Sequence, residues 1–189
     1  MNLFMEIAEF FHNIKTPLAI VHVGGVVLGM GGALVADMLF SFFSKDKKLN
    51  STEIYTLSIL SKLVLYSLIV IALSGLALFL SDVGEYINSA KFLAKMSILL
   101  VLLINGYLLN KYIWPHLLNK NFFTLKKERN IRRLAFVFGA ISVISWLSVF
   151  ALGSLHDLAV SYSSIISIYF VIVFLGIIIS LWVEKREFN

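Results

Sequence analysis

Residues 17–43 read PLAIVHVGGVVLGMGGALVADMLFSFF, and this stretch decides the fold class. It carries a single acidic residue, Asp37, and an apolar run of about 20 residues is long enough to cross the hydrocarbon core of a bilayer as an α-helix. Four further runs of the same kind follow, at residues 54–80, 91–112, 134–155 and 158–183. The sequence therefore predicts an all-α, polytopic membrane protein that is built as a five-transmembrane-helix bundle.

The composition agrees with a single membrane domain over residues 1–189. Hydrophobic residues make up 59% of the chain and charged residues 14%, with a mean hydropathy of +0.90. The predicted spans use most of the chain, so no length is left for a separate globular domain. The chain has no cysteine, which excludes disulfides, thiolate metal sites, iron–sulfur clusters and covalently attached c-type haem.

The basic residues set the predicted orientation. Most of the 16 Lys and Arg residues lie in the loop at residues 44–53, in the segment 111–133 and at the C-terminus. Because basic loops stay in the cytoplasm, we expect these segments to be cytoplasmic and the N-terminus to face outward, in the plasma (inner) membrane. The charges suit the lipid bilayer and its anionic headgroups, and no nucleic-acid partner is expected despite a pI near 9.4.

A short interfacial helix is predicted over residues 1–15, before the first span. Leu3, Ile7 and Phe10 recur at three- and four-residue spacing, with Glu6 on the other side. His12 lies near the end of this helix, where we interpret it as an interfacial polar residue.

Three groups with nitrogen donors are expected together on the outer side of the bundle. His22 lies near the start of the first span, His156 at the outer end of the fourth, and Lys95 about one turn into the third. Imidazole nitrogens at one depth between helices suit a haem iron or another metal. His22 and His156 are therefore candidate ligands of haem b. Lys95 is the alternative second ligand, or else a side chain that only extends to the interface.

Small residues share the helix face of His22. Gly25, Gly29 and Ala33 follow it at spacings of three or four, so they form one stripe. Such a stripe lets a second helix pack closely, within the chain or in a homodimer. Because the stripe begins at a histidine, Gly25 and Gly29 are also candidate contacts for a flat macrocycle.

The first span also carries a carboxylate in its inner half. An ionised side chain at this depth needs a partner, and Asp37 is predicted to pair with Lys62 of the second span. Tyr66 lies one turn beyond Lys62 on the same face. These three residues are candidates for either a structural ion pair or a proton relay.

Two short motifs resemble a known group of bacterial membrane proteins. His22 with the glycine-rich run that ends at Gly31-Gly32, and the later run Ala94-Lys95-Met-Ser-Ile-Leu-Leu-Val-Leu-Leu, resemble the copper-resistance D type proteins and the membrane protoporphyrinogen oxidases of the haem-pathway J type. The resemblance covers the first three spans, to about Asn110. It implies that His22 and Lys95 match a recurring histidine and lysine that are associated with b-type haem.

Two functions are therefore expected from the sequence. The leading hypothesis is a b-type haem protein that performs electron transfer or acts as a membrane oxidoreductase, with its site in the outer leaflet and a quinone or a periplasmic species as redox partner. The alternative is a small metal-ion or proton-coupled transporter that uses Asp37 and Lys62. A third hypothesis is a membrane scaffold. Hydrolytic chemistry is not expected, because the sequence has no Ser–His–Asp arrangement, phosphate-binding loop or zinc-protease motif.

Overall fold

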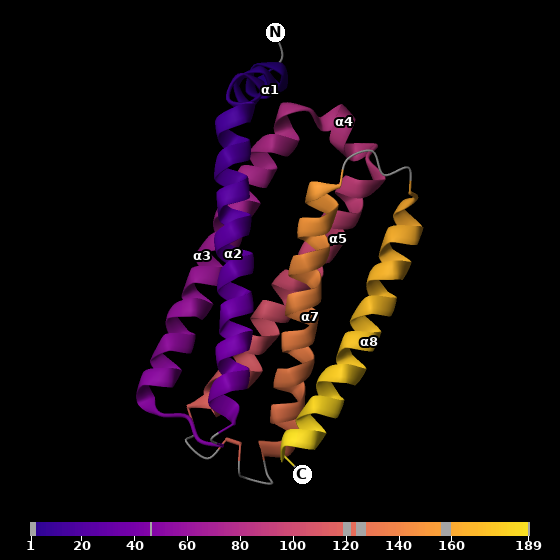
Figure 1. The fold of residues 1–189 in the computed structure, drawn as a ribbon. Helices are drawn as coiled ribbons and strands as arrows, with labels where there is room; N and C mark the ends of the chain where they lie inside the picture. Colours follow the sequence, from indigo (N-terminus) through magenta and orange to yellow (C-terminus); the bar gives the residue numbers. More distant parts are fainter. Residues whose placement is uncertain (1–2, 46, 119–121, 124–127, 156–159, 189) are drawn as a thin grey trace.

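The computed structural model describes residues 3–45, 47–118, 122–123, 128–155 and 160–188. Within these ranges the regular structure is helical throughout (Figure 1). The elements are α1 (Leu3–Asn13), α2 (Lys15–Ser44), α3 (Ser51–Ser81), α4 (Val83–Ile87), α5 (Ala90–Leu108), the π-helical turn η1 (Leu109–Ile113), α6 (Trp114–Leu117), α7 (Arg129–Ser154) and α8 (Tyr162–Phe188).

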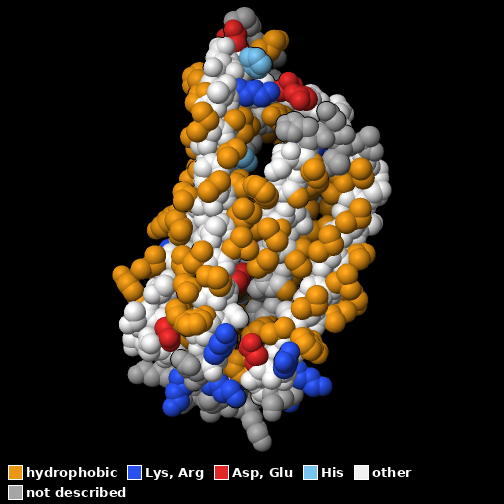
Figure 2. Space-filling model, in the orientation of Figure 1, with side chains coloured by type: hydrophobic (Ala, Val, Ile, Leu, Met, Phe, Trp, Pro, Cys, Tyr) orange, Lys and Arg blue, Asp and Glu red, His pale blue; other side chains and the backbone are white. Residues whose placement is uncertain are grey.

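Five helical segments in the described part of the chain are long and apolar enough to cross a membrane. They are α2, α3, the continuous segment from α5 through α6, α7 and α8. The outward faces of these helices are apolar, and most charged side chains visible in Figure 2 gather toward the two ends of the molecule. The predicted all-α fold with five apolar spans is confirmed, and it fits a multi-pass membrane protein. The predicted start of the fifth span, at residue 158, lies outside the described residues.

The spans run alternately up and down, so each end of the bundle can be named by what it carries. The α4 end holds α1, α4 and the first turns of α2, and the C-terminal end holds α6, the loop between α2 and α3, and the last turn of α8 (Figure 1). Helices α2 and α3 pack along their length, α7 packs against α5 and α8, and α2 contacts α7. The α2–α7 contact joins the two groups of helices.

The turn between α2 and α3 is closed by a capping box. The Asn50 side chain accepts a hydrogen bond from the Glu53 backbone N–H at 2.9 Å, and the Glu53 carboxylate accepts one from the Asn50 backbone N–H at 2.7 Å. These bonds satisfy two backbone donors that the first turn of a helix leaves without partners.

The third span does not stop at its proline, because the helix widens just before it. Pro115 has no N–H to donate to the carbonyl of Lys111, and residues 109–113 form a π turn there. A π turn accommodates the missing bond and rotates the residues around it. The span therefore ends at Leu117 rather than at the predicted residue 112.

Contacts between α2 and α7 fix the register of the two groups. A Cβ added to Gly29 would lie 2.6 Å from Trp146 Cη2, and one added to Gly139 would lie 3.4 Å from Asp37 Oδ1. Gly29 therefore lies opposite Trp146, and Asp37 opposite Gly139, in an antiparallel pair.

Replacing Gly29 with alanine is expected to destabilise the fold by about 1–3 kcal/mol, because the new methyl group overlaps the rigid indole of Trp146. It would also lie 3.1 Å from Ser67 Cβ on α3. Gly31→Ala is the matched control, since a Cβ there meets no heavy atom within 4 Å. Thermal unfolding in detergent measures both variants, and equal melting temperatures would contradict this packing.

Candidate functional site

The His22 side chain is held against α3 by one hydrogen bond and one glycine. The ring lies over Gly75, where an added Cβ would come within 3.2 Å of His22 Cε1. His22 Nδ1 lies 3.0 Å from Ser74 Oγ, and Ser74 Oγ lies 2.5 Å from the carbonyl oxygen of Val70. A carbonyl oxygen only accepts, so the Ser74 hydroxyl donates to Val70. Its oxygen is then the acceptor for His22 Nδ1–H, and Nε2 keeps its lone pair.

The second predicted donor, Lys95, faces the same region. It is half-buried on α5, in the neighbourhood of the His22 ring. Figure 2 shows the surface hollowed between α2 and α7 near the α4 end, with a histidine side chain at the edge of the hollow. His22 and Lys95 therefore lie in the same part of the bundle.

The third predicted donor, His156, lies outside the described residues. The register of α2 and α7 still locates the point where the chain approaches it. Seven residues separate His22 from Gly29, which is about 10 Å along a helix. The same rise from Trp146 leads to the last turn of α7, which ends at Ser154. His22 is thus roughly level with the end of α7, two residues before position 156.

The other two histidines are separate from this region. His12 is exposed on α1, and His116 Nδ1 lies 2.7 Å from the Glu128 carboxylate at the C-terminal end. No group of three or more His, Asp or Glu side chains that could hold a metal ion occurs among the described residues.

The predicted role of Gly25 and Gly29 at a macrocycle does not match their surroundings. A Cβ on Gly25 would lie 3.0 Å from Ile71 Cγ1 of α3, and Gly29 faces Trp146 and Ser67. Both glycines are buried by protein side chains. The stripe serves helix packing within the chain, because side chains of α3 and α7 occupy the space directly in front of these two glycines.

The predicted ion pair between Asp37 and Lys62 is not formed. Leu57, Ser61 and Val64 of α3 face the interior of the bundle, whereas Lys62 is exposed, as is Tyr66 at 63%. A helix turns by about 100° per residue, so Lys62 points away from the face that Ser61 presents. Lys62 and Tyr66 do share a face, but it is the outer one, and neither lines the cavities beside Asp37.

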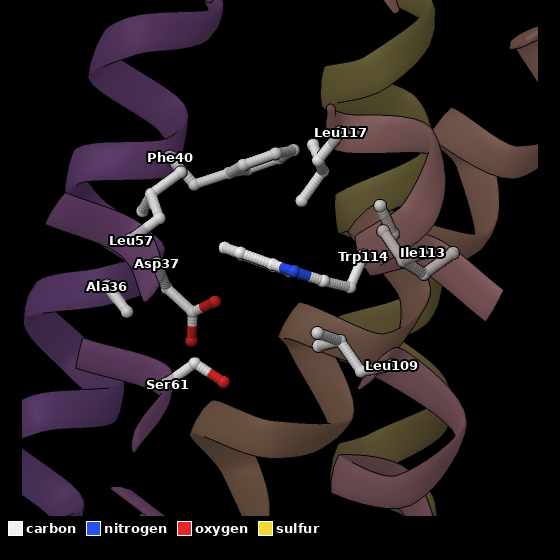
Figure 3. Close-up of a pocket in the computed structure, with 10 residues that line it drawn as sticks. Ala36, Asp37, Phe40, Leu57, Ser61, Leu109, Ile113, Trp114 and Leu117 are labelled. Carbon is white, nitrogen blue, oxygen red and sulfur yellow. The ribbon is translucent and has the colours of Figure 1, made fainter. Parts of the chain in front are cut away.

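Asp37 borders a cavity that could not be located from the sequence alone. A space of about 390 Å³ lies between α2, α3, α5 and α7, and a smaller one of about 100 Å³ adjoins it toward the C-terminal end. Asp37 and Ser61 line both. Figure 3 shows the Asp37 carboxylate and the Ser61 hydroxyl pointing into the smaller cavity, on the side of the Trp114 ring.

Several polar residues around this cavity were missed as site candidates. Asn105 is 4% exposed, lines the larger cavity, and donates to the Phe138 carbonyl at 3.0 Å, but its Oδ1 has no partner in the described part of the chain. Ser61 donates to Asn110 Oδ1 at 3.3 Å. Asn105 could have been found from the sequence, because it is an amide in the middle of an apolar span, and such a group is costly in a bilayer unless it has a hydrogen-bond partner or a function. Ser74 carried no such signal, because serine is common in membrane helices.

Comparison with known proteins finds no family model, no curated protein and no solved structure that matches this chain.

Proposed function

We propose that this chain is a b-type haem-binding integral membrane protein in which His22 is an axial ligand of the iron. One observation carries the proposal: the hydrogen bond from His22 Nδ1 to Ser74 Oγ. An iron ligand must present a neutral nitrogen with a free lone pair, and a histidine ligand normally donates its other N–H to a fixed acceptor. His22 meets both conditions through Ser74, and Gly75 leaves room for the ring to stay in this orientation.

The second axial ligand is the other part of the proposal. His156 follows the end of α7, which is roughly level with His22, and this favours it as the partner. The amine of Lys95 is the alternative, because it reaches the same part of the bundle from α5. Lys91 donates to the carbonyl of Leu155. The first turn of α5 is therefore hydrogen-bonded to the residue directly before His156.

The proposed orientation puts the α4 end outside the plasma membrane. The support is the distribution of charge, since basic residues concentrate at the C-terminal end, where Arg132, Arg133 and Lys185 lie. The haem site is then in the outer leaflet. A bound haem supplies one-electron chemistry, and His22, with its buried hydrogen bond, tunes the iron through ligand basicity. A quinone or a periplasmic species is the redox partner that this depth suits.

The geometry gives less support to the alternative of a metal-ion or proton-coupled transporter. That hypothesis required Asp37 and Lys62 to interact, but Asp37 lines the cavity inside the bundle and Lys62 is exposed on the outer face of α3. Among the described residues no cluster of metal ligands replaces the pair.

Haem titration of the purified protein in mild detergent tests the proposal. We expect saturable binding with a sharp Soret band, and Ser74→Ala is expected to weaken haem affinity by roughly 10–100-fold, because the ring loses the acceptor that orients it. Ser81→Ala is the matched control, since in the described part of the chain the buried Ser81 hydroxyl donates to the Leu78 carbonyl of its own helix, at 2.7 Å, and to no other helix. Absence of saturable binding by the unaltered protein would overturn the proposal.

A further inference from the structure

The cavity beside Asp37 opens sideways, toward the lipid. Its exposed lining residues lie on α3, α5 and η1: Leu65 is 53% exposed, Leu103 42% and Tyr107 61%, and Asn110 of η1 is exposed as well. None of the lining residues from α2 and α7 is exposed, and Ala33 and Trp146 are buried. Since α3 and α5 present their outer faces to the bilayer, a molecule dissolved in the membrane reaches this space without crossing water.

The volume and lining of the cavity suit a small organic molecule. About 390 Å³ lies at the lower end of the range of small-molecule sites. Half of the residues in the walls are leucine, valine or alanine, and two of the three tryptophans of the chain lie there, Trp114 beside the smaller space and Trp146 beside the larger one. Such a lining accepts an apolar or aromatic body.

Two polar groups in the walls are acceptors that have no partner among the described residues. The Asp37 carboxylate points into the cavity (Figure 3) and forms no ion pair or hydrogen bond within the described residues. Asn105 adds an amide oxygen without a partner. A carboxylate at membrane depth is costly unless a positive charge or a proton compensates it. Lys62, the cation predicted for this role, faces away.

We propose that this cavity binds a membrane-soluble organic cation, with an apolar body between α3 and α5 and an ammonium group next to Asp37. A carboxylate supplies the counter-charge, and the tryptophan faces add attraction for a desolvated cation. Entry from the lipid suits the two exposed leucines of the lining, Leu65 and Leu103. The site is distinct from the one proposed at His22, because Asp37 lies about four turns further along α2.

Intrinsic fluorescence gives a direct test, because Trp114 and Trp146 line the site while Trp182 is 59% exposed on α8. In a Trp182→Phe background every remaining tryptophan reports on the cavity. The probe is benzyltrimethylammonium, and neopentylbenzene is its neutral counterpart of the same shape. We expect saturable quenching or a spectral shift with the cation, and a non-saturating response to the neutral compound.

Asp37→Asn keeps the shape of the side chain and removes its charge, so it is expected to weaken cation binding by about tenfold or more. Glu53→Gln is the matched control, since it makes the same change in a carboxylate outside the cavity and glutamine still serves the capping box. Equal affinity of Asp37→Asn and the parent, or equal binding of the neutral compound, would overturn the proposal. A melting temperature unchanged from the parent establishes that the variant is folded. Haem binding is measured separately, so failure here leaves the His22 proposal untouched.

Discussion

Protein carrying His22→Gly is expected to lose the haem spectrum and to regain it when free imidazole is added. The substitution leaves a ring-sized space between α2 and α3, bordered by Gly75 and by the Ser74 hydroxyl. Added imidazole can occupy this space and donate to Ser74, so its second nitrogen restores the ligand. Absorption spectra of the haem-incubated variant, with and without imidazole, measure the effect.

His12→Gly is the control for this experiment. His12 is exposed on α1, and its loss should leave the spectrum unchanged with or without imidazole. An unchanged spectrum in His22→Gly would show that another residue holds the iron. A loss without rescue, at a normal melting temperature, would show that Ser74 does not orient the ligand.

Glu184→Ala is expected to destabilise the fold by about 3–5 kcal/mol, the cost of leaving a buried charge without its partner. Glu184 is 2% exposed, and its two carboxylate oxygens accept from Arg132 Nε at 2.8 Å and from Arg133 Nε at 3.3 Å. Arg132 is 4% exposed and also donates to the Phe123 carbonyl at 3.0 Å. Without the carboxylate, the partners left to the Arg132 guanidinium among the described residues are that carbonyl and the Phe188 ring, whose centroid lies 4.6 Å from Cζ.

Thermal unfolding in detergent measures this loss, with a decrease in melting temperature on the order of 10 °C. Lys185→Ala changes the adjacent exposed residue and should have little effect. The double variant Arg132→Met, Glu184→Leu should recover part of the stability, because it removes the buried charges together. A Glu184→Ala protein as stable as the parent would mean that this network does not join α7 to α8.

The five spans were predictable because they depend on composition over about 20 residues, and no detail of packing enters. The rotation of each helix was not predictable in the same way. Lys62 and Tyr66 do share a face, as their spacing requires, but spacing does not say which way that face points. Ser61, one residue earlier, turned out to be the residue that meets Asp37 in the cavity.

The glycine stripe shows the same limit. Spacing correctly placed Gly25 and Gly29 on one face and predicted close packing. A glycine stripe in the sequence, however, is equally compatible with a packed helix and with a bound flat cofactor. Only the position of Ile71 and Trp146 distinguishes them. The π turn before Pro115 was also beyond reach, since a proline near the end of a span is usually read as its end.

The site at His22 was found because histidine is rare in an apolar span. Ser74, the residue that orients His22, was not predicted. It belongs to a different helix, and its contact with His22 depends on the register between α2 and α3. The cavity beside Asp37 could not be predicted, because it forms only where four helices are placed together, and the sequence analysis assigned no role to its amide residue Asn105.

The most direct test of haem binding is the difference spectrum of the protein as purified from membranes, dithionite-reduced minus oxidised. Ligation by His22 predicts a Soret band that shifts on reduction and the appearance of α and β bands in the parent protein. A chain that stays colourless, both as isolated and after incubation with haem, would contradict it.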